Sequence, residues 1–419
     1  MEKLTLFKRK REILFFTLVM LLFFAIHLYL RYQSFLTFHE HKFFRTEAKV
    51  LNHYQKSKPN GKTYQVLKLK TQNGAVFYTT NYEDLIDLKG RDILVGMITD
   101  GVTFWEYLRT FYAPTYDIRI FEKEEGIKER LLGFIQKQHE NNTTKALFSA
   151  LFLATPIPKS LRADVSKLGI SHLIAISGFH LGVLFGIFYF LFKYPYAYLQ
   201  QRYFPYRNMR FDLTMVILAI LFAYLWMLDF IPSLLRSFVM LAYGFFLFHR
   251  NFRILSFEVL FVTVLTILAL FPSFLFSIGF WFSVAGVFYI YLFLHHFSHL
   301  KAWQIVILLN IWVYISMIPI VHFFFDVFSW YQLYSPLLSV LFGVFYPVEM
   351  FLHLIGQGDL FDGMVLKLLG QKAQIYHFTT PLWYLIVYIV VSIAAVFEKR
   401  LFYLLVPMSI GVYFLGQLS

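Results

Sequence analysis

Long apolar stretches separated by short polar connections occupy most of the chain. The first stretch, residues 13–30, follows a cluster of Lys and Arg and is followed by Arg31. A helix of this length nearly crosses a hydrocarbon core of ~30 Å. Because no small-residue cleavage pattern follows it, we expect residues 1–34 to be an uncleaved membrane anchor with a cytoplasmic N-terminus.

A second series of apolar stretches fills the chain from residue 146 to residue 419, which predicts a polytopic α-helical membrane body. Residues 146–154 are too short to span and precede Pro156, so we expect a re-entrant segment beside a polar interior. The glycine-rich residues 356–380 are expected to be half-length or interfacial. The predicted spans cover residues 170–192, 213–231, 234–248, 254–271, 274–294, 303–325, 336–355, 382–397 and 401–415.

Residues 42–122 are polar and show short alternating runs between turn signals, which indicates β-strands. Five strands and one short helix suit a small barrel of the oligonucleotide-binding (OB) type. We expect this OB-like domain to lie outside the cytoplasmic membrane, since it follows the anchor. The predicted strands are residues 47–53, 63–71, 75–80, 91–99 and 116–121, with the helix at residues 82–88.

Positive charge gathers at the start of this small domain. Residues 42–70 hold eight Lys and Arg against Glu47 alone, a net charge of +7, with Tyr54 and Tyr64 among them. Such a hairpin could bind phosphates by charge and stack on bases, or it could be an edge strand protected from aggregation by lysines. The candidate DNA-binding residues are Lys49, Lys56, Lys58, Lys62, Lys68 and Lys70.

Residues 123–145 carry Ile127, Leu131, Phe134 and Ile135 at helical spacing, with charged residues on the other faces. This pattern predicts an amphipathic helix. The helix would lie in the membrane interface, although packing against the small domain explains the same stripe.

Composition sharpens this interpretation. The 419 residues are 58% hydrophobic and 15% charged, with a mean hydropathy of +0.58, which excludes a soluble enzyme. The net charge of +13 suits cytoplasmic loops or a polyanionic partner. The chain has no cysteine, so it forms no disulfide and no Cys-ligated zinc site.

The span that begins near residue 170 opens on polar residues. Ser177 and His180 share a helix face, and an intramembrane hydrolase built on them lacks a nearby carboxylate. Glycines at a spacing of four allow close helix approach, and the predicted packing glycines are Gly178, Gly182, Gly186 and Gly279. Polar groups inside apolar helices mark a hydrated path, and the candidate channel-lining residues are Ser171, His172, Ser177, His180, Arg236 and Ser283.

Arg236 is the strongest candidate, because it begins a span after Pro232 and stays charged. The alternative is an interfacial arginine that snorkels to water. His295, His296 and His299 have the spacing of metal ligands, but no carboxylate or thiolate accompanies them, so we predict no metal and no cofactor.

The run from Ala163 to Leu184, with Gly169-Ile170-Ser171-His172-Leu173-Ile174-Ala175-Ile176-Ser177-Gly178-Phe179-His180, resembles the signature of the ComEC family, inner-membrane channels for DNA uptake in natural transformation. Residues 232–240, 271–283 and 322–336 are similar to later family segments. Two positions depart from the pattern: Phe271 stands where members often have Asp, and Trp281 where they have Gln. The polar contacts that this Asp and Gln would make in family members are therefore not expected in this chain.

The resemblance implies a bacterial inner-membrane channel that passes single-stranded DNA into the cytoplasm, with the small domain in the periplasm and duplex DNA as a further ligand there. Many members continue into a metallo-β-lactamase-like nuclease domain, but this chain contains no His-x-His-x-Asp-His motif and resembles a short form. It also has no P-loop, so we expect no enzyme activity. The implied partners are membrane lipid, a periplasmic DNA receptor, a cytoplasmic motor or single-strand-binding proteins, and a separate nuclease.

A secondary transporter for a small anionic or amphipathic solute is the main alternative, since broken helices also form midplane transport sites. Internal repeat symmetry would favour that alternative, and the sequence shows none that is convincing.

Overall fold

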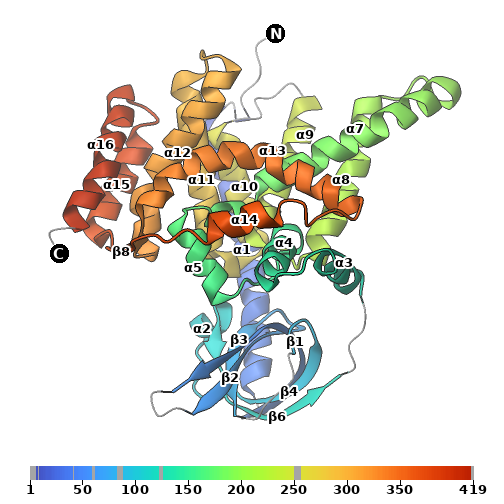
Figure 1. Cartoon of the computed structure of the whole chain (residues 1–419), viewed down its shortest axis with the longest axis vertical. Coiled ribbons are helices and arrows are strands. Elements are labelled where there is room, and N and C mark those ends of the chain that lie inside the picture. Colours follow the sequence, from blue (N-terminus) through green and yellow to red (C-terminus); the bar gives the residue numbers. More distant parts are fainter. Residues whose placement is uncertain are drawn as a thin grey trace. The chain divides into compact units, whose positions relative to one another are not determined.

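The computed structural model describes residues 6–7, 9–40, 42–58, 62–82, 88–121, 126–249 and 256–416. The chain divides into two compact units, which we describe separately (Figure 1). The sheet unit comprises Phe7–Ile127 and Leu265–Ser277. The helical unit contains Lys128–Val264 and Ile278–Ser419.

The sheet unit contains a strand at each predicted position. Its six strands are β1 (Phe43–Ser57), β2 (Thr63–Thr71), β3 (Val76–Asn81), β4 (Asp92–Ile98), β5 (Phe111–Tyr112) and β6 (Thr115–Ile120). The predicted helix at residues 82–88 falls mostly outside the described residues. A helix that the sequence reasoning missed, α2 (Phe104–Leu108), begins at Thr103, whose hydroxyl accepts a hydrogen bond from the Glu106 amide.

The sheet is not closed into a barrel, so the prediction of a closed five-stranded barrel is wrong. Its strand order is β5-β3-β2-β1-β4-β6, which leaves β5 and β6 at opposite edges. The two edge strands are separated in the chain only by Ala113 and Pro114. Pro114 has no N–H to donate, and it separates β5 from β6, which covers the predicted last strand at residues 116–121. The Ala113 amide bonds to Tyr78 O, while Pro114 O accepts from the Ile98 amide.

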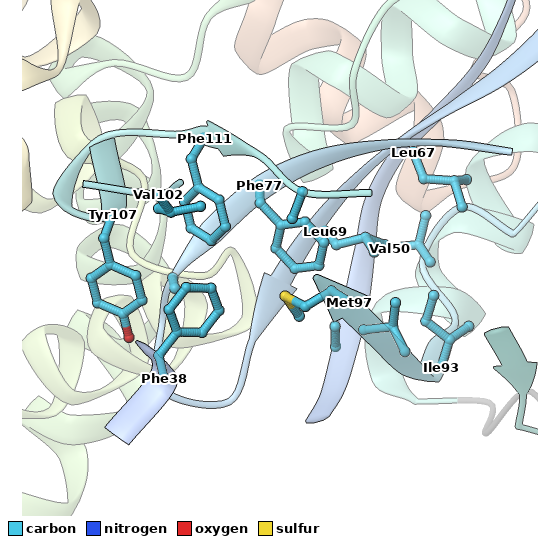
Figure 2. Close-up of a cluster of buried hydrophobic side chains, with 14 of the residues drawn as sticks. Phe38, Val50, Leu67, Leu69, Phe77, Ile93, Met97, Val102, Tyr107 and Phe111 are labelled. Carbon is cyan, nitrogen blue, oxygen red and sulfur yellow. The ribbon is translucent and has the colours of Figure 1, made fainter. Parts of the chain in front are cut away.

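One apolar core fills the sheet unit, and the N-terminal helix contributes to it. Helix α1 (Lys10–His39) continues beyond the predicted anchor boundary at residue 34, and its last turns bury Phe35 and Phe38. Phe38 packs with Tyr107 and Phe111 beside Leu69 and Met97 (Figure 2). The last turns of α1 and the sheet therefore share one core.

The helical unit begins with two short helices where the sequence predicts one amphipathic helix and a re-entrant segment. Helix α3 (Ile127–Gln136) ends early, and α4 (Asn142–Leu153) begins at Asn141, whose side chain accepts from the Thr143 amide at 2.7 Å. Most of α4 is buried. The predicted boundary at residue 145 is therefore wrong, because the Asn141 cap starts a new helix inside the predicted one.

The remaining helices follow the predicted apolar stretches closely, with one exception at residues 170–192. There a short helix α6 precedes a long helix α7, so the predicted span is broken near its start. The elements are α5 (Lys159–Lys167), α6 (Ser171–Ile174), α7 (Gly178–Tyr203), α8 (Met209–Met227), α9 (Pro232–His249), α10 (Phe257–Leu270), η1 (Pro272–Phe276), α11 (Ile278–Phe297), α12 (Ala302–Phe324), β7 (Val327–Phe328), η2 (Trp330–Tyr334), α13 (Ser335–Leu354), α14 (Asp362–Leu369), β8 (Tyr376–His377), α15 (Leu382–Ala394) and α16 (Lys399–Gly416).

Within the described residues, six helical segments have the length and hydropathy to cross a membrane. They are Lys10–His39, Gly178–Tyr203, Met209–Met227, Ile278–Phe297, Ala302–Phe324 and Trp330–Leu354. Shorter apolar helices occur at Pro232–Leu247, Phe257–Leu270 and Leu382–Ala394.

Candidate functional site

The polar break between α6 and α7 is formed by local hydrogen bonds. Ser177 precedes α7, and its amide donates to Nδ1 of His180 at 3.1 Å. The Ser177 hydroxyl lies at the same distance from that nitrogen. The Ser177 and His180 side chains therefore cap the start of α7 reciprocally. Because His180 Nδ1 faces the Ser177 amide, its first role is structural, which weakens the hydrolase alternative.

Gly169 makes the preceding turn possible. Its φ of +69° is in the left-handed region that glycine adopts without strain. A Cβ at this position would also lie 3.2 Å from Gln332 Cβ. The Ser335 hydroxyl donates to Gly169 O at 2.9 Å, so the turn between α5 and α6 is fixed against α13.

Arg236 lies on α9 next to this break and is 5% exposed. Its Nε donates to Ser283 Oγ on α11 at 2.8 Å, and its Nη2 donates to Ser237 Oγ at 3.0 Å. Nη1 contacts Met240 Sδ at 2.9 Å. A snorkelling arginine would reach water, whereas this guanidinium is enclosed by helices.

The Arg236 site is also joined to the start of α7. Ser233 on α9 donates to Ile176 O at 2.7 Å. A Cβ at Gly178 would lie only 2.8 Å from Ser237 Oγ and 3.8 Å from Arg236 Nη2. The structure therefore brings together Gly178, Arg236 and Ser283, which are far apart in sequence.

Among the described residues, Arg236 has no carboxylate within 4.0 Å. Its hydrogen bonds go to two hydroxyls and a thioether, all uncharged, and they use three of the five guanidinium N–H groups. A buried charge normally has a counter-charge. The site is therefore electrostatically incomplete, with donor capacity left for an anion.

The other candidate channel residues lie apart from Arg236 in the hydrogen-bond network. Ser171 and His172 on α6 are exposed. Ser171 Oγ lies 3.3 Å from Ser166 Oγ, and His172 Nε2 lies 3.1 Å from Ser339 Oγ on α13. Ser171 thus contacts α5 and His172 contacts α13, instead of α9 and α11.

Of the predicted packing glycines, Gly178 lies close to a neighbouring helix. A Cβ at Gly182 or Gly186 would meet no atom of the described residues within 4 Å. The predicted glycine ridge is therefore wrong at these two positions. Gly279 is exposed at the start of α11.

The candidate DNA-binding lysines share one face of the sheet. The pairs Lys49 with Lys70 and Asn52 with Lys68 alternate with the buried pair Val50 and Leu69. Lys56 pairs with Tyr64 on the same outward face as Lys68. Because cross-strand partners point to the same side of a sheet, the lysines form a stripe across β1 and β2. We call it the basic face.

Tyrosine rings lie between the lysines of the basic face. Lys56 Nζ lies 5.8 Å from the ring centre of Tyr54, and Lys68 Nζ lies 5.5 Å from that of Tyr78. Lys58 contacts the Tyr82 ring at 5.0 Å, and its Nζ donates to the Tyr82 hydroxyl at 3.0 Å. This hydrogen bond raises the pKa of Lys58. Lys62 and Lys70 lie beside these residues.

Four lysines of the basic face have no acidic partner within 4.0 Å among the described residues. They are Lys49, Lys56, Lys58 and Lys68. By contrast, Arg45 on the same strand is paired with Asp117 at 3.1 Å. The face thus combines uncompensated positive charge with half-buried tyrosine rings and the exposed ring of Tyr82. Positive charge beside aromatic rings is found in proteins that bind single-stranded nucleic acid.

Two acidic residues of the helical unit pair with histidines. Asp326 pairs with His377 at 2.9 Å, and Glu349 lies 3.3 Å from His353. His296 Nε2 lies 2.8 Å from the Ala395 carbonyl.

Sequence reasoning missed one buried cluster, Asp362, His139, His353 and Glu349. A Glu and a His four residues apart inside an apolar stretch were the signal that could have indicated it.

These features are those of an integral membrane protein with several membrane-spanning helices and a polar site inside its helical body. The chain belongs to the Competence protein family: the family model matches residues 154–402, which include the Arg236 site and the α6–α7 break. The ComEC-type resemblance is thereby confirmed. Membership indicates a role in DNA uptake for transformation. Searches of curated proteins and of solved structures found no significant match.

Proposed function

We propose that this protein is the inner-membrane conduit through which one DNA strand enters the cytoplasm during natural transformation. A strand carries one negative charge per nucleotide, and charge is costly inside a bilayer. A conduit therefore needs fixed positive charge at membrane depth, positioned by surrounding helices.

The single observation that carries this proposal is the buried Arg236. It lies in apolar helix α9, has two uncharged hydroxyl partners, and has no carboxylate within 4.0 Å among the described residues. A backbone phosphate is an anionic acceptor whose oxygens the planar guanidinium fork binds in a bidentate manner. Transient pairing with successive phosphates would neutralise Arg236 without holding the strand permanently.

The basic face supplies the second part of the proposal, capture of DNA before translocation. Its lysines attract phosphates through counterion release, and its tyrosines stack on unpaired bases. We place this face in the periplasm, with the N-terminus of α1 in the cytoplasm.

We further propose that the protein acts without catalysis of its own. Force would come from a cytoplasmic motor or single-strand-binding proteins, delivery from a periplasmic DNA receptor, and removal of the other strand from a separate nuclease.

Gene deletion in the transformable host tests the proposed function. Cells receive duplex DNA labelled in both strands, and label bound at the surface is measured separately from label in the cytoplasm. We expect surface binding to persist while cytoplasmic label and transformants disappear. Unchanged entry of label would instead favour a solute transporter.

Orientation can be tested in the same strain because the chain has no cysteine. Single cysteines placed at Lys56 and at Arg207 should react differently with a membrane-impermeant maleimide. We expect labelling from the periplasm at position 56 only. Labelling at position 207 alone would reverse the proposed topology.

A further inference from the structure

The buried cluster of Asp362, His139, His353 and Glu349 lies within the helical unit and is separate from the Arg236 site. His139 Nδ1 lies 2.9 Å from Asp362 Oδ1, and His139 Nε2 lies 3.0 Å from His353 Nε2. His353 Nδ1 lies 2.8 Å from the Glu349 carbonyl oxygen and 3.3 Å from Glu349 Oε2. Four titratable side chains thus form a continuous row.

The protons in this row can be counted. The Glu349 carbonyl only accepts hydrogen bonds, so His353 Nδ1 carries a proton, and an ionised Asp362 requires the same of His139 Nδ1. The two Nε2 atoms of neutral rings would then both be acceptors, which cannot hydrogen-bond to each other. The 3.0 Å contact therefore requires one further proton. If this further proton is bound to Asp362 instead, the number of protons in the row is the same.

Glu349 lies at the end of the row opposite Asp362, and its surroundings require a nearby positive charge or a proton. Its side chain is 0% exposed, and neither carboxylate oxygen has a hydrogen-bond partner among the described residues. An ionised carboxylate in that state is costly unless a positive charge lies beside it. A cationic histidine pair at 3.3 Å supplies that charge, or donates a proton and leaves Glu349 neutral.

The outer end of the row reaches solvent. Asp362 is 16% exposed and lines a surface hollow of about 480 Å³ together with Glu140, Asn141, Asp359 and Leu366. Its other oxygen accepts a hydrogen bond from Thr144 Oγ1 on α4 at 2.9 Å. The titratable groups around the histidines are therefore Glu349 on α13, Asp362 on α14, and Glu140 and Asp359 at the hollow.

The Glu349 end of the row lies near the polar break between α6 and α7. Tyr346 lies one helical turn before Glu349 on α13, and its ring centre lies 4.5 Å from that of His180. His180 caps α7, so a change of charge at Glu349 acts on the helix that packs against this cap.

We propose that Asp362, His139, His353 and Glu349 form a proton-binding relay between the hollow and the interior of α13. A proton enters from water at Asp362 and is shared between the two Nε2 atoms. When His353 passes its Nδ1 proton to Glu349 Oε2, the ring keeps the shared proton at Nε2. Imidazolium and carboxylate then become imidazole and carboxylic acid, with no net charge lost.

The first test is ¹⁵N-histidine NMR of the full-length protein in lipid nanodiscs, at about pH 8, where ordinary histidines are neutral. We expect one imidazolium signal, lost in both His139→Gln and His353→Gln because the proton is shared. The exposed His299 provides the control, and His299→Gln should leave the signal unchanged. Two neutral rings in the wild type would overturn the proposal, as would a stoichiometric zinc ion lost with either substitution.

The second test measures the relay by the rate at which the Glu349 carboxylic acid exchanges in deuterium oxide. Its infrared band is assigned by loss in Glu349→Gln. We expect exchange to slow about tenfold or more in His353→Gln, the change that roughly 1.4 kcal/mol in a barrier produces. Unchanged exchange in that variant, or no protonated Glu349 at any pH, would overturn the relay.

Two glycine variants separate ring position from folding. A Cβ at Gly358 would lie 2.7 Å from three ring atoms of His353, whereas a Cβ at Gly363 meets no described atom within 4 Å. Gly358→Ala should therefore abolish the imidazolium signal with every titratable group still present, and Gly363→Ala should retain it. Retention in both variants would show that the Nε2 contact does not hold the proton.

Discussion

The Arg236 site and the basic face carry charge of the same sign in opposite environments. Arg236 is a single guanidinium, 5% exposed and held by Ser237 and Ser283. The basic face spreads its charge over exposed or half-buried lysines beside tyrosine rings. Charges in water are screened and contribute little individually, whereas a desolvated charge acts strongly on one ligand. If the proposed function is correct, we expect DNA capture to depend additively on several lysines and DNA passage to depend on the single residue Arg236.

The largest expected effect is at Arg236. Arg236→Met keeps an unbranched side chain but removes the guanidinium and its charge. We expect DNA entry to fall about a hundredfold or more, since losing one partner of the proposed buried arginine–phosphate pair costs roughly 2–5 kcal/mol. The fold should persist, because the lost charge has no carboxylate partner among the described residues. Cytoplasmic label and thermal unfolding measure the two effects.

Arg236→Lys is the matched variant. It keeps the charge but loses the guanidinium fork that contacts Ser237 and Ser283, so an intermediate loss of entry is expected. Normal DNA entry in Arg236→Met would contradict the proposed difference between the Arg236 site and the basic face, and would indicate a purely structural role for Arg236.

A smaller effect is expected at Gly178, which positions the Arg236 site without carrying charge. A Cβ there would lie 2.8 Å from Ser237 Oγ. Gly178→Ala should displace Ser237, cost roughly 1–3 kcal/mol by overpacking, and reduce DNA entry about tenfold. Gly182→Ala has open space among the described residues and serves as the control. Equal effects of the two variants would show that helix propensity, and not the Ser237 contact, is responsible.

Charge reversal on the basic face should weaken capture more gradually. We expect the triple change of Lys56, Lys58 and Lys62 to Glu to make the negative slope of log affinity against log salt shallower by about 2. Each phosphate contact to a single strand contributes near 0.7 to the magnitude of that slope. Binding of a labelled oligonucleotide to the full-length protein in nanodiscs measures the slope.

The control for this prediction changes net charge equally at another surface. Lys159, Lys301 and Lys372 are exposed on the helical unit, and their combined reversal to Glu should leave the slope nearly unchanged. Equal loss in both triple variants would mean that overall charge, rather than the face, attracts DNA.

The smallest effect is expected from Tyr82→Phe. It removes the hydrogen bond that raises the pKa of Lys58, but the ring remains beside the ammonium. Lysine is charged at neutral pH with or without that bond, because its ordinary pKa is already near 10.4. We expect less than about a twofold change in oligonucleotide affinity, within the range of an exposed contact. A tenfold loss would show that capture depends on single residues too.

Much of the architecture follows from local pattern. The apolar stretches after residue 200 predict helices within a few residues of their observed ends, because lipid demands an internally hydrogen-bonded backbone. Alternation and turn signals likewise predict the strands of the sheet unit. Boundaries failed where one side chain decides them: Asn141 starts a helix inside a predicted helix, and Ser177 with His180 breaks a predicted span.

The lysines of the basic face were readable from sequence because strands β1 and β2 are neighbours in the chain. Their common orientation follows from the pairing of Lys49 with Lys70 and of Lys56 with Tyr64. The contact between Lys68 and Tyr78 follows from the pairing of β2 with β3. A local hairpin therefore needs little tertiary information to define its surface.

By itself, the sequence determined the class of this protein: the apolar helices, the lysine-rich hairpin and the signature around Ser177 and His180, since each depends on neighbouring residues. Only the tertiary structure decided that Arg236 is enclosed beside Ser283, and that His139 meets His353 across more than two hundred residues. The reason is physical: burial and counter-charge are properties of the packed interior, and distant helices create that interior only when they assemble.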